Sequence, residues 1–410
     1  MYKVIREPKY DFIGQSYASS YPNLHKYPAT MIPHLGIELF KDLEIKTNAK
    51  LLDPYCGSGS SFVVGLEAGI KQIYGNDINP LATLISKAKF TKLNIDLVKY
   101  EQRKIRESVF EKLKDENYIN NAIIPNITNV NYWFSTPILA NLSVIKHFID
   151  EIKDNGIKQL FLVPFSETVR ECSYTRNNEF KLYRIKSDEI QYFNPDVTGV
   201  FFLKLAKVID IYEKYYFPLI LSNAEIVIEN SAFTPTPNFY DVVLTSPPYG
   251  DSKTTVAYGQ FSCLSNEWLG FVSARQIDNM LMGGKKTKKI YEKGIISDCI
   301  KKIESTDNNR ALEVSSFYFD LDTSIKNVAK SIKKNGTAIY IVGNRRVKDT
   351  QLLTDQFVAE KFEENGFEHF VTYERALTSK AMPLRNSPTN KIGATKGTMT
   401  QEFIVICKKM

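Results

Sequence analysis

The sequence predicts an α/β fold built on a mostly parallel β-sheet with helices on both faces. Three observations carry this prediction. A strand, a glycine turn and a helix follow one another at 49–69, a second strand ends in the carboxylate of Asp77, and an apolar run at 242–244 is soon followed by two prolines. Each places polar groups at the carboxyl end of a strand, which is where open α/β sheets bind their ligands.

Length and composition exclude several classes of protein. The chain has 410 residues, enough for one large core and a second lobe. Its 43% hydrophobic and 24% charged residues are ordinary for a globular protein. We expect no membrane span, no signal peptide and a cytoplasmic location, because no long apolar run occurs. The five cysteines and four histidines are scattered, so neither a disulfide framework nor a metal site is predicted.

The first helix is predicted from Pro33. Proline suits the first helical position, and Leu35, Leu39 and Leu43 recur at four-residue spacing, which gives one buried face. Just before this helix, residues 25–29 read His-Lys-Tyr-Pro-Ala.

The segment 49–69 predicts a strand that ends at Asp53, followed by a glycine turn and a helix from about Ser60. Gly57 and Gly59 let the backbone approach a ligand closely, and the helix N-terminus presents free N–H groups. No Gly-Lys-Ser/Thr follows, so the turn is not a Walker A loop.

The second strand, at 72–77, ends in Asp77. This carboxylate lies about 20 residues beyond the glycines, the spacing at which an acidic side chain meets ribose hydroxyls in dinucleotide folds. A lone Asp at a strand end is more often a turn residue or a cap, but its place after this strand, turn and helix favours cofactor binding. Asn79 and Pro80 then begin another helix.

Residues 92–222 interrupt the alternation and predict a mainly helical insertion. Within it, the segment 165–184 interleaves basic, acidic and aromatic side chains. The basic residues could follow a sugar-phosphate chain or pair with the neighbouring glutamates, and we slightly favour the ion pairs. The charged residues concerned are Arg170, Arg176, Lys181, Arg184, Glu167, Glu171 and Glu179.

The alternation resumes with a strand at 224–231, and residues 242–244 follow as a short buried strand. Two prolines then fix the backbone, so the chain beyond Ser246 forms a rigid extended corner at the strand's carboxyl end. This corner offers a hydroxyl, backbone carbonyls and the ring of Tyr249. Such groups suit a planar ligand that bears an exocyclic NH2.

Residues 251–314 predict a second insertion, which contains a loop of glycines and lysines at 282–289. We expect this basic loop to be mobile. Its lysines, and the basic excess of residues 330–410, suit a polyanion, although solvated lysines explain each patch equally well. The loop lysines are Lys285, Lys286, Lys288 and Lys289. The remaining predicted elements are helices at 324–334 and 351–364 and strands at 337–342, 369–373 and 402–407.

Three of these segments resemble motifs of the amino DNA methyltransferases, which use S-adenosylmethionine. Residues 25–29 are similar to motif X, residues 53–60 to motif I and residues 245–249 to motif IV. The resemblance implies a Rossmann-like class I methyltransferase sheet with a reversed final strand. It assigns S-adenosylmethionine to Tyr27, Asp53, Tyr55, Gly57, Ser58, Gly59, Asp77, Ile78 and Asn230, and catalysis to Ser246, Pro247, Pro248 and Tyr249.

The resemblance also implies how the chain is divided. Residues 1–91, 223–250 and 315–410 would form the cofactor-binding catalytic domain. Residues 92–222 would be a helical insertion, and residues 251–314 a basic insertion that is a candidate for DNA recognition.

The Ser-Pro-Pro-Tyr form of motif IV occurs most often in the cytosine-N4 branch of the family, whereas the adenine-N6 branch usually carries Asp or Asn first. The resemblance therefore implies a site-specific methyltransferase that acts on the N4 of a flipped cytosine in duplex DNA, with a cognate restriction endonuclease as a candidate companion. Adenine-N6 methylation, an inactive DNA-recognition subunit and, more weakly, an RNA substrate are the alternatives. No metal and no covalent intermediate are expected, since the Pro-Cys dipeptide of cytosine-C5 enzymes is absent.

Overall fold

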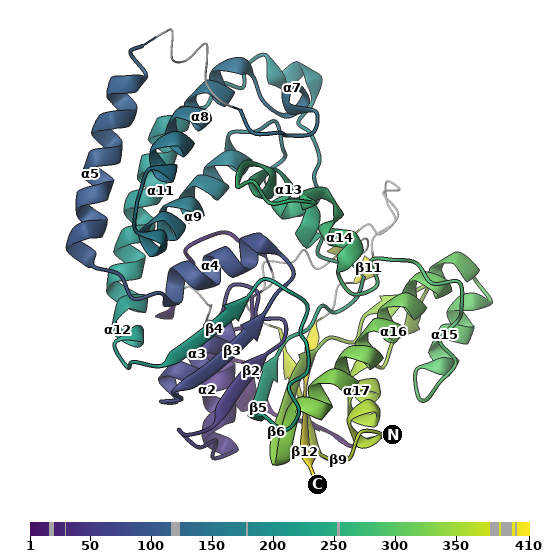
Figure 1. The fold of residues 1–410 in the computed structure, drawn as a ribbon. Helices are drawn as coiled ribbons and strands as arrows, with labels where there is room; N and C mark the ends of the chain where they lie inside the picture. The colour runs from purple at the N-terminus through teal and green to yellow at the C-terminus, as the bar shows by residue number, and fades with distance from the viewer. Residues whose placement is uncertain are drawn as a thin grey trace.

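The fold combines a layered α/β body with a helical lobe, which lies above the sheet in Figure 1. In this computed structural model, the described residues are 1–15, 20–28, 30–115, 124–177, 179–251, 255–377, 385–386, 396–397 and 400–410.

An eight-stranded sheet forms the centre of the body, in the order β1-β9-β12-β6-β5-β2-β3-β4. β12 runs antiparallel to its neighbours β6 and β9, while the other pairings in this sheet are parallel. The predicted fold class, with its reversed final strand, is therefore confirmed. The strands are β1 (Val4–Arg6), β2 (Lys50–Asp53), β3 (Gln72–Asn76), β4 (Glu225–Glu229), β5 (Tyr240–Thr245), β6 (Ile332–Val342), β9 (Phe367–Ala376) and β12 (Gln401–Lys409).

Helices cover both faces of the sheet. One face carries α2 (Pro33–Asp42), α3 (Ser60–Glu67) and α4 (Pro80–Phe90), and the other carries α16 (Asn308–Ser331) and α17 (Thr354–Glu363). β5 lies between β2 and β6, and the connections from β2 and from β5 lead in opposite directions along the sheet. The turns after β2 and β5 therefore meet at a switch point, where such sheets bind ligands.

Both predicted insertions contribute to the helical lobe. The first supplies α5 (Ile95–Lys112), α7 (Val130–Trp133), α8 (Thr136–Asp150), α9 (Asn155–Glu171), α10 (Ser187–Ile190), α11 (Val197–Ile211), η2 (Tyr212–Tyr216) and α12 (Phe217–Ile220). The second supplies α13 (Tyr258–Trp268), η3 (Ala274–Gln276) and α14 (Ile277–Met280), and α13 packs on α9. The rest of the second insertion, with α15 (Ser297–Glu304), packs on α16 instead. Short strand pairs β7 (Arg346–Val347) with β8 (Thr350–Gln351), and β10 (Arg385–Asn386) with β11 (Lys396–Gly397), lie outside the central sheet.

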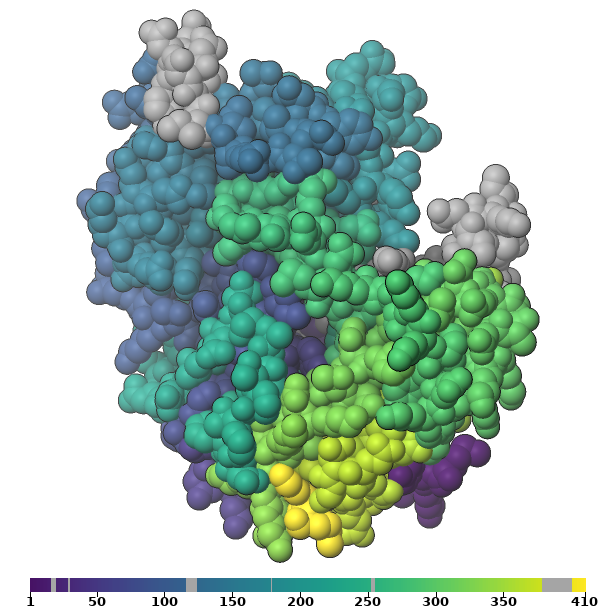
Figure 2. Space-filling view, turned by 45° about the vertical axis from the view of Figure 1, so that its right-hand side comes forward, coloured from purple at the N-terminus to yellow at the C-terminus, as the bar shows by residue number. Residues whose placement is uncertain are grey.

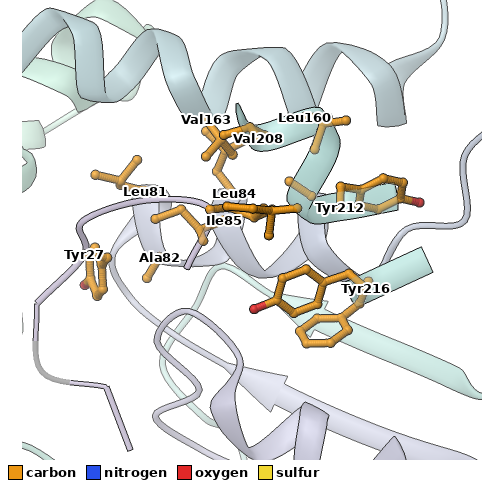
Figure 3. Close-up of a cluster of buried hydrophobic side chains, with 14 of the residues drawn as sticks. Tyr27, Leu81, Ala82, Leu84, Ile85, Leu160, Val163, Val208, Tyr212 and Tyr216 are labelled. Atoms are coloured by element: carbon orange, nitrogen blue, oxygen red, sulfur yellow. The ribbon is translucent and has the colours of Figure 1, made fainter. Parts of the chain in front are cut away.

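Helix α4 joins the body to the lobe. Its residues Leu84 and Ile85 lie against Leu160 and Val163 of α9 and Val208 of α11 in Figure 3. These five side chains are buried, so the lobe and the sheet share one continuous apolar core. No described helix is both long and apolar enough to cross a membrane.

Helix α16 differs clearly from the predicted helix at 324–334. It begins at Asn308, within the predicted second insertion. Helix α16 ends at Ser331 rather than near residue 334, and β6 begins directly at Ile332. Ile332 is fully buried and pairs with Tyr240 of β5, so sheet pairing ends the helix before Asn335 is reached. The edge strand β1 was not predicted from the sequence, because three residues carry too little pattern.

Candidate active site

The glycine turn between β2 and α3 has two left-handed residues. Gly57 has φ +51° and Gly59 has φ +84°. A Cβ atom at Gly59 would lie 2.5 Å from the ring of Phe90, whereas a Cβ atom at Gly57 would meet nothing within 4 Å. Gly59 is therefore needed for packing against α4, and Gly57 leaves open space beside the turn.

Asp53 ties this turn to the end of β5. Its carboxylate accepts hydrogen bonds from the Tyr55 N–H at 3.0 Å, from Ser61 Oγ at 2.6 Å and from Thr245 Oγ1 at 2.6 Å. Burial raises the pKa of Asp53 to about 6, although these bonds act in the opposite direction. Thr245 immediately precedes Ser246, so the glycine turn and the proline corner are fixed relative to each other.

Asp77 lies beside the same turn and keeps some exposed surface. Its carboxylate accepts the N–H of Gly57 at 3.0 Å and the N–H of Asn79 at 2.8 Å. Burial raises the pKa of Asp77 to about 6. The Asn230 side chain donates to the carbonyls of Asp77 and Ile78 at 2.9 and 3.0 Å, so it holds this stretch of backbone in place.

Two α4 residues that the sequence reasoning missed hold the turn from the other side. Ser86 Oγ donates to the Gly57 carbonyl and Lys89 Nζ donates to the Ser58 carbonyl, both at 2.8 Å. Lys89 is fully buried. The signal was their three-residue spacing, which places both on one face of a predicted helix. The Ser58 hydroxyl is buried and has no hydrogen-bond partner among the described residues, so it can meet a polar ligand atom.

Tyr27 approaches the start of α4. Its hydroxyl accepts from Asn79 Nδ2 at 3.1 Å, and its ring stacks on Tyr258 of α13 with centroids 5.9 Å apart. Asn79 Nδ2 also lies 3.0 Å from Ser262 Oγ of α13. The segment that resembles motif X, the connection from β3 to α4 and the second insertion therefore meet at one buried polar residue, Asn79.

Tyr55 is directed elsewhere. Its hydroxyl hydrogen-bonds Ser324 of α16, and burial raises the pKa of the phenol well above its ordinary value. A role of this side chain in cofactor binding stays a prediction.

The proline corner follows β5 at the switch point. Pro247 is buried, while Ser246, Pro248 and Tyr249 keep part of their surface exposed. Figure 2 shows the surface hollowed between the green segment of α13 and α14 and the body below it. A small hollow beside the corner is lined by Pro248, Gly250, Val256, Tyr258, Leu281 and Met282.

A chain of hydrogen bonds leads from the corner to two buried charges. Ser246 Oγ donates to Tyr249 Oη at 3.2 Å, and Tyr249 Oη donates to Glu402 Oε1 at 2.8 Å. Arg375 Nε and Nη2 donate to Glu402 Oε2 at 3.0 and 2.8 Å, and Arg375 Nη1 donates to the Tyr10 carbonyl at 2.8 Å. Burial and the Glu402 carboxylate raise the pKa of Tyr249 well above its ordinary value, so it stays a phenol.

The basic loop differs from its prediction. Two backbone-to-side-chain bonds hold it to α16, from Gly283 N–H to Asp320 at 2.8 Å and from Thr287 N–H to Ser316 at 2.7 Å. Just beyond the loop, Tyr291 N–H donates to Ser315 at 3.0 Å. The backbone is therefore anchored rather than loose. The exposed side chains of the loop are those of Lys285, Lys286, Lys288 and Lys289. Much of the other basic segment, at 378–399, lies outside the described residues.

The arginines of the first insertion bind within the fold. Arg170 donates to the carbonyls of Phe261 and Glu179 at 2.8 and 2.5 Å, and Arg184 donates to the Tyr132 carbonyl at 2.8 Å. Arg176 pairs with Glu179 at 3.3 Å. Internal partners were favoured from the sequence, but most of these are backbone oxygens. Glu167 and Glu171 pair with Lys204.

The chain is related in sequence to a curated methyltransferase. It is 38% identical over 416 aligned residues to the type II methyltransferase M.MvaI of Kocuria varians, and the match covers 94% of this chain and 90% of that protein. This chain belongs to the type II methyltransferases. The S-adenosylmethionine cofactor predicted for it agrees with this membership.

A second relative of this methyltransferase is more distant. The type II methyltransferase M.MjaII of Methanocaldococcus jannaschii is 26% identical over 167 residues, which is 40% of this chain and 29% of that protein. No family model matches the sequence.

Two solved structures align with the methyltransferase at low similarity. A putative S-adenosylmethionine-dependent methyltransferase from Listeria monocytogenes covers 92% of this chain and aligns over 99% of its own length, with a TM-score of 0.29 and 9% identity. The rRNA methyltransferase aviRa from Streptomyces viridochromogenes covers 98% of this chain over 93% of its own, with a TM-score of 0.31 and 12% identity. With TM-scores this low, neither likeness bears on the fold.

Proposed function

We propose that this methyltransferase is a site-specific DNA methyltransferase that transfers a methyl group from S-adenosylmethionine to the exocyclic N4 of a flipped cytosine in duplex DNA. The observation that carries the proposal is the position of Ser246. It follows Thr245, whose hydroxyl binds Asp53, so a hydrogen-bonding hydroxyl stands beside the glycine turn.

The residues around the turn fit the cofactor. S-adenosylmethionine, when bound, supplies an electrophilic methyl group. The open space at Gly57 admits a ligand to the backbone, the buried Ser58 hydroxyl offers it an unused polar atom, and the Asp77 carboxylate can accept from ribose hydroxyls. Asn230 supports this site through its bonds to the Asp77 and Ile78 carbonyls.

The corner fits the acceptor amine. The lone pair of an aromatic NH2 is delocalised into the ring and is a poor nucleophile. Hydrogen bonds accepted by Ser246 Oγ and the Pro247 carbonyl would draw this nitrogen towards a pyramidal form aimed at the methyl group. The ring of Tyr249 would stack on the extruded base, at about 1 to 3 kcal/mol. Serine at the first position of the corner, as in the cytosine-N4 branch, supports cytosine as the base.

The exposed lysines of the anchored loop suit the phosphates of duplex DNA, which must supply part of the few kcal/mol that base flipping costs. Membership of the type II methyltransferases supports a place in a restriction-modification system, with an endonuclease acting on the same site.

The experiment that tests the proposal is methylation of mixed-sequence duplex DNA, followed by mass spectrometry of the released nucleosides. We expect N4-methylcytosine. N6-methyladenine as the sole product would overturn the cytosine assignment, and the absence of any methylated nucleoside would favour an inactive recognition subunit. Ser246→Ala should lower turnover more than cofactor binding, because its bond to the amine matters at the transition state. Full activity of Ser246→Ala would break the mechanism.

A further inference from the structure

We propose that Glu402 sets the direction of the hydrogen bonds that end at Ser246, and that this makes Ser246 an acceptor selective for an amino group. The inference rests on the proposed function and assigns to Glu402 and Arg375 a positioning role in it. Neither residue lies in a segment that resembles a motif of the family.

The direction starts at a carboxylate. An ionised carboxylate can accept hydrogen bonds but cannot donate them. The 2.8 Å contact between Tyr249 Oη and Glu402 Oε1 therefore uses the tyrosine proton. With its proton committed, Tyr249 Oη must be the acceptor in its 3.2 Å contact with Ser246 Oγ, and the serine proton points away from the substrate. Ser246 then turns lone pairs towards a bound base.

Arg375 keeps this direction from reversing. The guanidinium is always charged and donates twice to Glu402 Oε2, at 3.0 and 2.8 Å. Glu402 is 3% exposed and Arg375 is 2% exposed, so the pair is buried and each charge needs the other. The Arg375 side chain is itself fixed by its bond to the Tyr10 carbonyl. One oxygen of Glu402 thus faces Arg375 and the other faces Tyr249.

A glutamine at position 402 would reverse the direction of these hydrogen bonds without changing the shape of the side chain. Its amide oxygen would take the place that faces the two Arg375 donors, since the NH2 group cannot accept them. The NH2 group would then face Tyr249 and donate to it. Tyr249 would turn its proton towards Ser246, and the serine proton would turn towards the base.

The two directions select different bases. Cytosine presents an N4 amino group where uracil presents the O4 carbonyl. When the serine hydroxyl acts only as an acceptor, it forms a hydrogen bond with the amine of cytosine, whereas the carbonyl of uracil faces its lone pairs. A site built on such a hydrogen bond rejects the analogue that lacks the donor. A serine that donates favours the carbonyl instead. The Glu402 carboxylate therefore acts as a chemical filter for the exocyclic group.

The experiment uses the full chain and two duplex oligonucleotides that carry its mapped site, one with cytosine and one with uracil at the target. Should the mapped base be adenine, hypoxanthine replaces uracil as the keto analogue. The variants are Glu402→Gln and Tyr249→Phe. Glu402→Gln reverses the direction of the hydrogen bonds that end at Ser246. Tyr249→Phe interrupts these hydrogen bonds but keeps the ring and the Glu402–Arg375 pair. Tyr340→Phe is the matched control, because the Tyr340 hydroxyl is buried and has no hydrogen-bond partner in the described part of the chain.

We expect Tyr249→Phe to lower kcat and to reduce the binding preference for cytosine over uracil by roughly five- to tenfold, the effect of one hydrogen bond. Glu402→Gln should reduce both further, and Tyr340→Phe should match the wild type. Cofactor affinity should stay within about twofold in all three. Loss of activity with an unchanged preference would mean a merely structural role and would overturn the inference. If Glu402→Gln does not fold, Tyr249→Phe decides alone. A wild type that methylates no DNA would refute the proposed function itself, whereas an active wild type with insensitive variants would refute the filter.

Discussion

The two left-handed glycines of the turn between β2 and α3 should respond differently to alanine. Gly59→Ala places a Cβ atom 2.5 Å from the Phe90 ring. That ring is packed against Phe62 and Tyr216, with centroids 5.4 and 6.0 Å away, so it cannot yield. Overpacking of about 1 to 3 kcal/mol adds to about 1 to 2 kcal/mol for the left-handed backbone. We expect Gly59→Ala to lose about 2 to 5 kcal/mol of unfolding free energy.

Gly57→Ala meets nothing within 4 Å and should lose only the backbone cost, about 1 to 2 kcal/mol. That strain is present with and without ligand and cancels in a binding measurement. If the open space at Gly57 is where the cofactor approaches, the new methyl group should weaken S-adenosylmethionine binding by about tenfold or more.

Urea unfolding and calorimetric titration of both variants separate these effects. Gly59→Ala should unfold at the lower urea concentration. Gly57→Ala should lose less stability but should bind the cofactor more weakly than its small stability loss explains. Equal stability losses would show that the Phe90 ring does not constrain the turn. Wild-type cofactor affinity in folded Gly57→Ala would show that the cofactor lies elsewhere.

Three further predictions concern charged residues. Asp77→Ala should weaken S-adenosylmethionine binding by roughly tenfold to a hundredfold, because a charge-assisted hydrogen bond contributes about 1.5 to 3 kcal/mol. Unchanged affinity in calorimetric titration of a folded variant would remove Asp77 from the site. Burial raises the pKa of Asp53 to about 6, so the folded state binds the Asp53 proton more tightly than the unfolded chain does. The contribution of Asp53 to stability is therefore full below the pKa of the unfolded state and is lost as the pH rises through 6. As the pH is lowered from 7 to 5, this residue should add about 1 kcal/mol to the unfolding free energy, measured by urea titration at each pH. An Asp53→Asn variant whose unfolding free energy changes with pH as the wild type's does would contradict that assignment. Neutralising Lys285, Lys286, Lys288 and Lys289 together should weaken binding to all duplexes alike. The slope of the logarithm of the binding constant against the logarithm of the salt concentration should flatten by up to about 0.9 for each phosphate that a lysine had neutralised. An unchanged slope would mean that the loop is merely solvated.

Local signals were enough to predict the parts of the candidate site that lie within one short segment. The turn at Gly57 and Gly59, the strand end at Asp77 and the corner at Ser246 each combine a strand pattern with residues that end it. Parallel strands bring their carboxyl ends to one edge, so predicting the strands also placed these groups together.

Partners that meet through the sheet could not be predicted in this way. Glu402 and Arg375 face each other because β12 pairs with β9, and the pair reaches Tyr249 through Glu402, which lies 153 positions further along the chain. A buried Arg–Glu pair has no periodic pattern, and its members read as ordinary charges on strands. The same holds for α13, whose Trp268 is buried in the lobe although its segment was predicted as part of a basic loop insertion.

The position of β12 also orders the events of synthesis. β12 follows every other strand of the central sheet along the chain, yet it lies between β6 and β9. Until residues 401–409 emerge from the ribosome, β9 and β1 have no neighbouring strand through which to join β6, β5 and β2. Glu402 arrives on this same strand, so Tyr249 gains its carboxylate partner as the sheet closes. A growing chain can thus form the glycine turn early, whereas the hydrogen bonds of the proline corner are completed last.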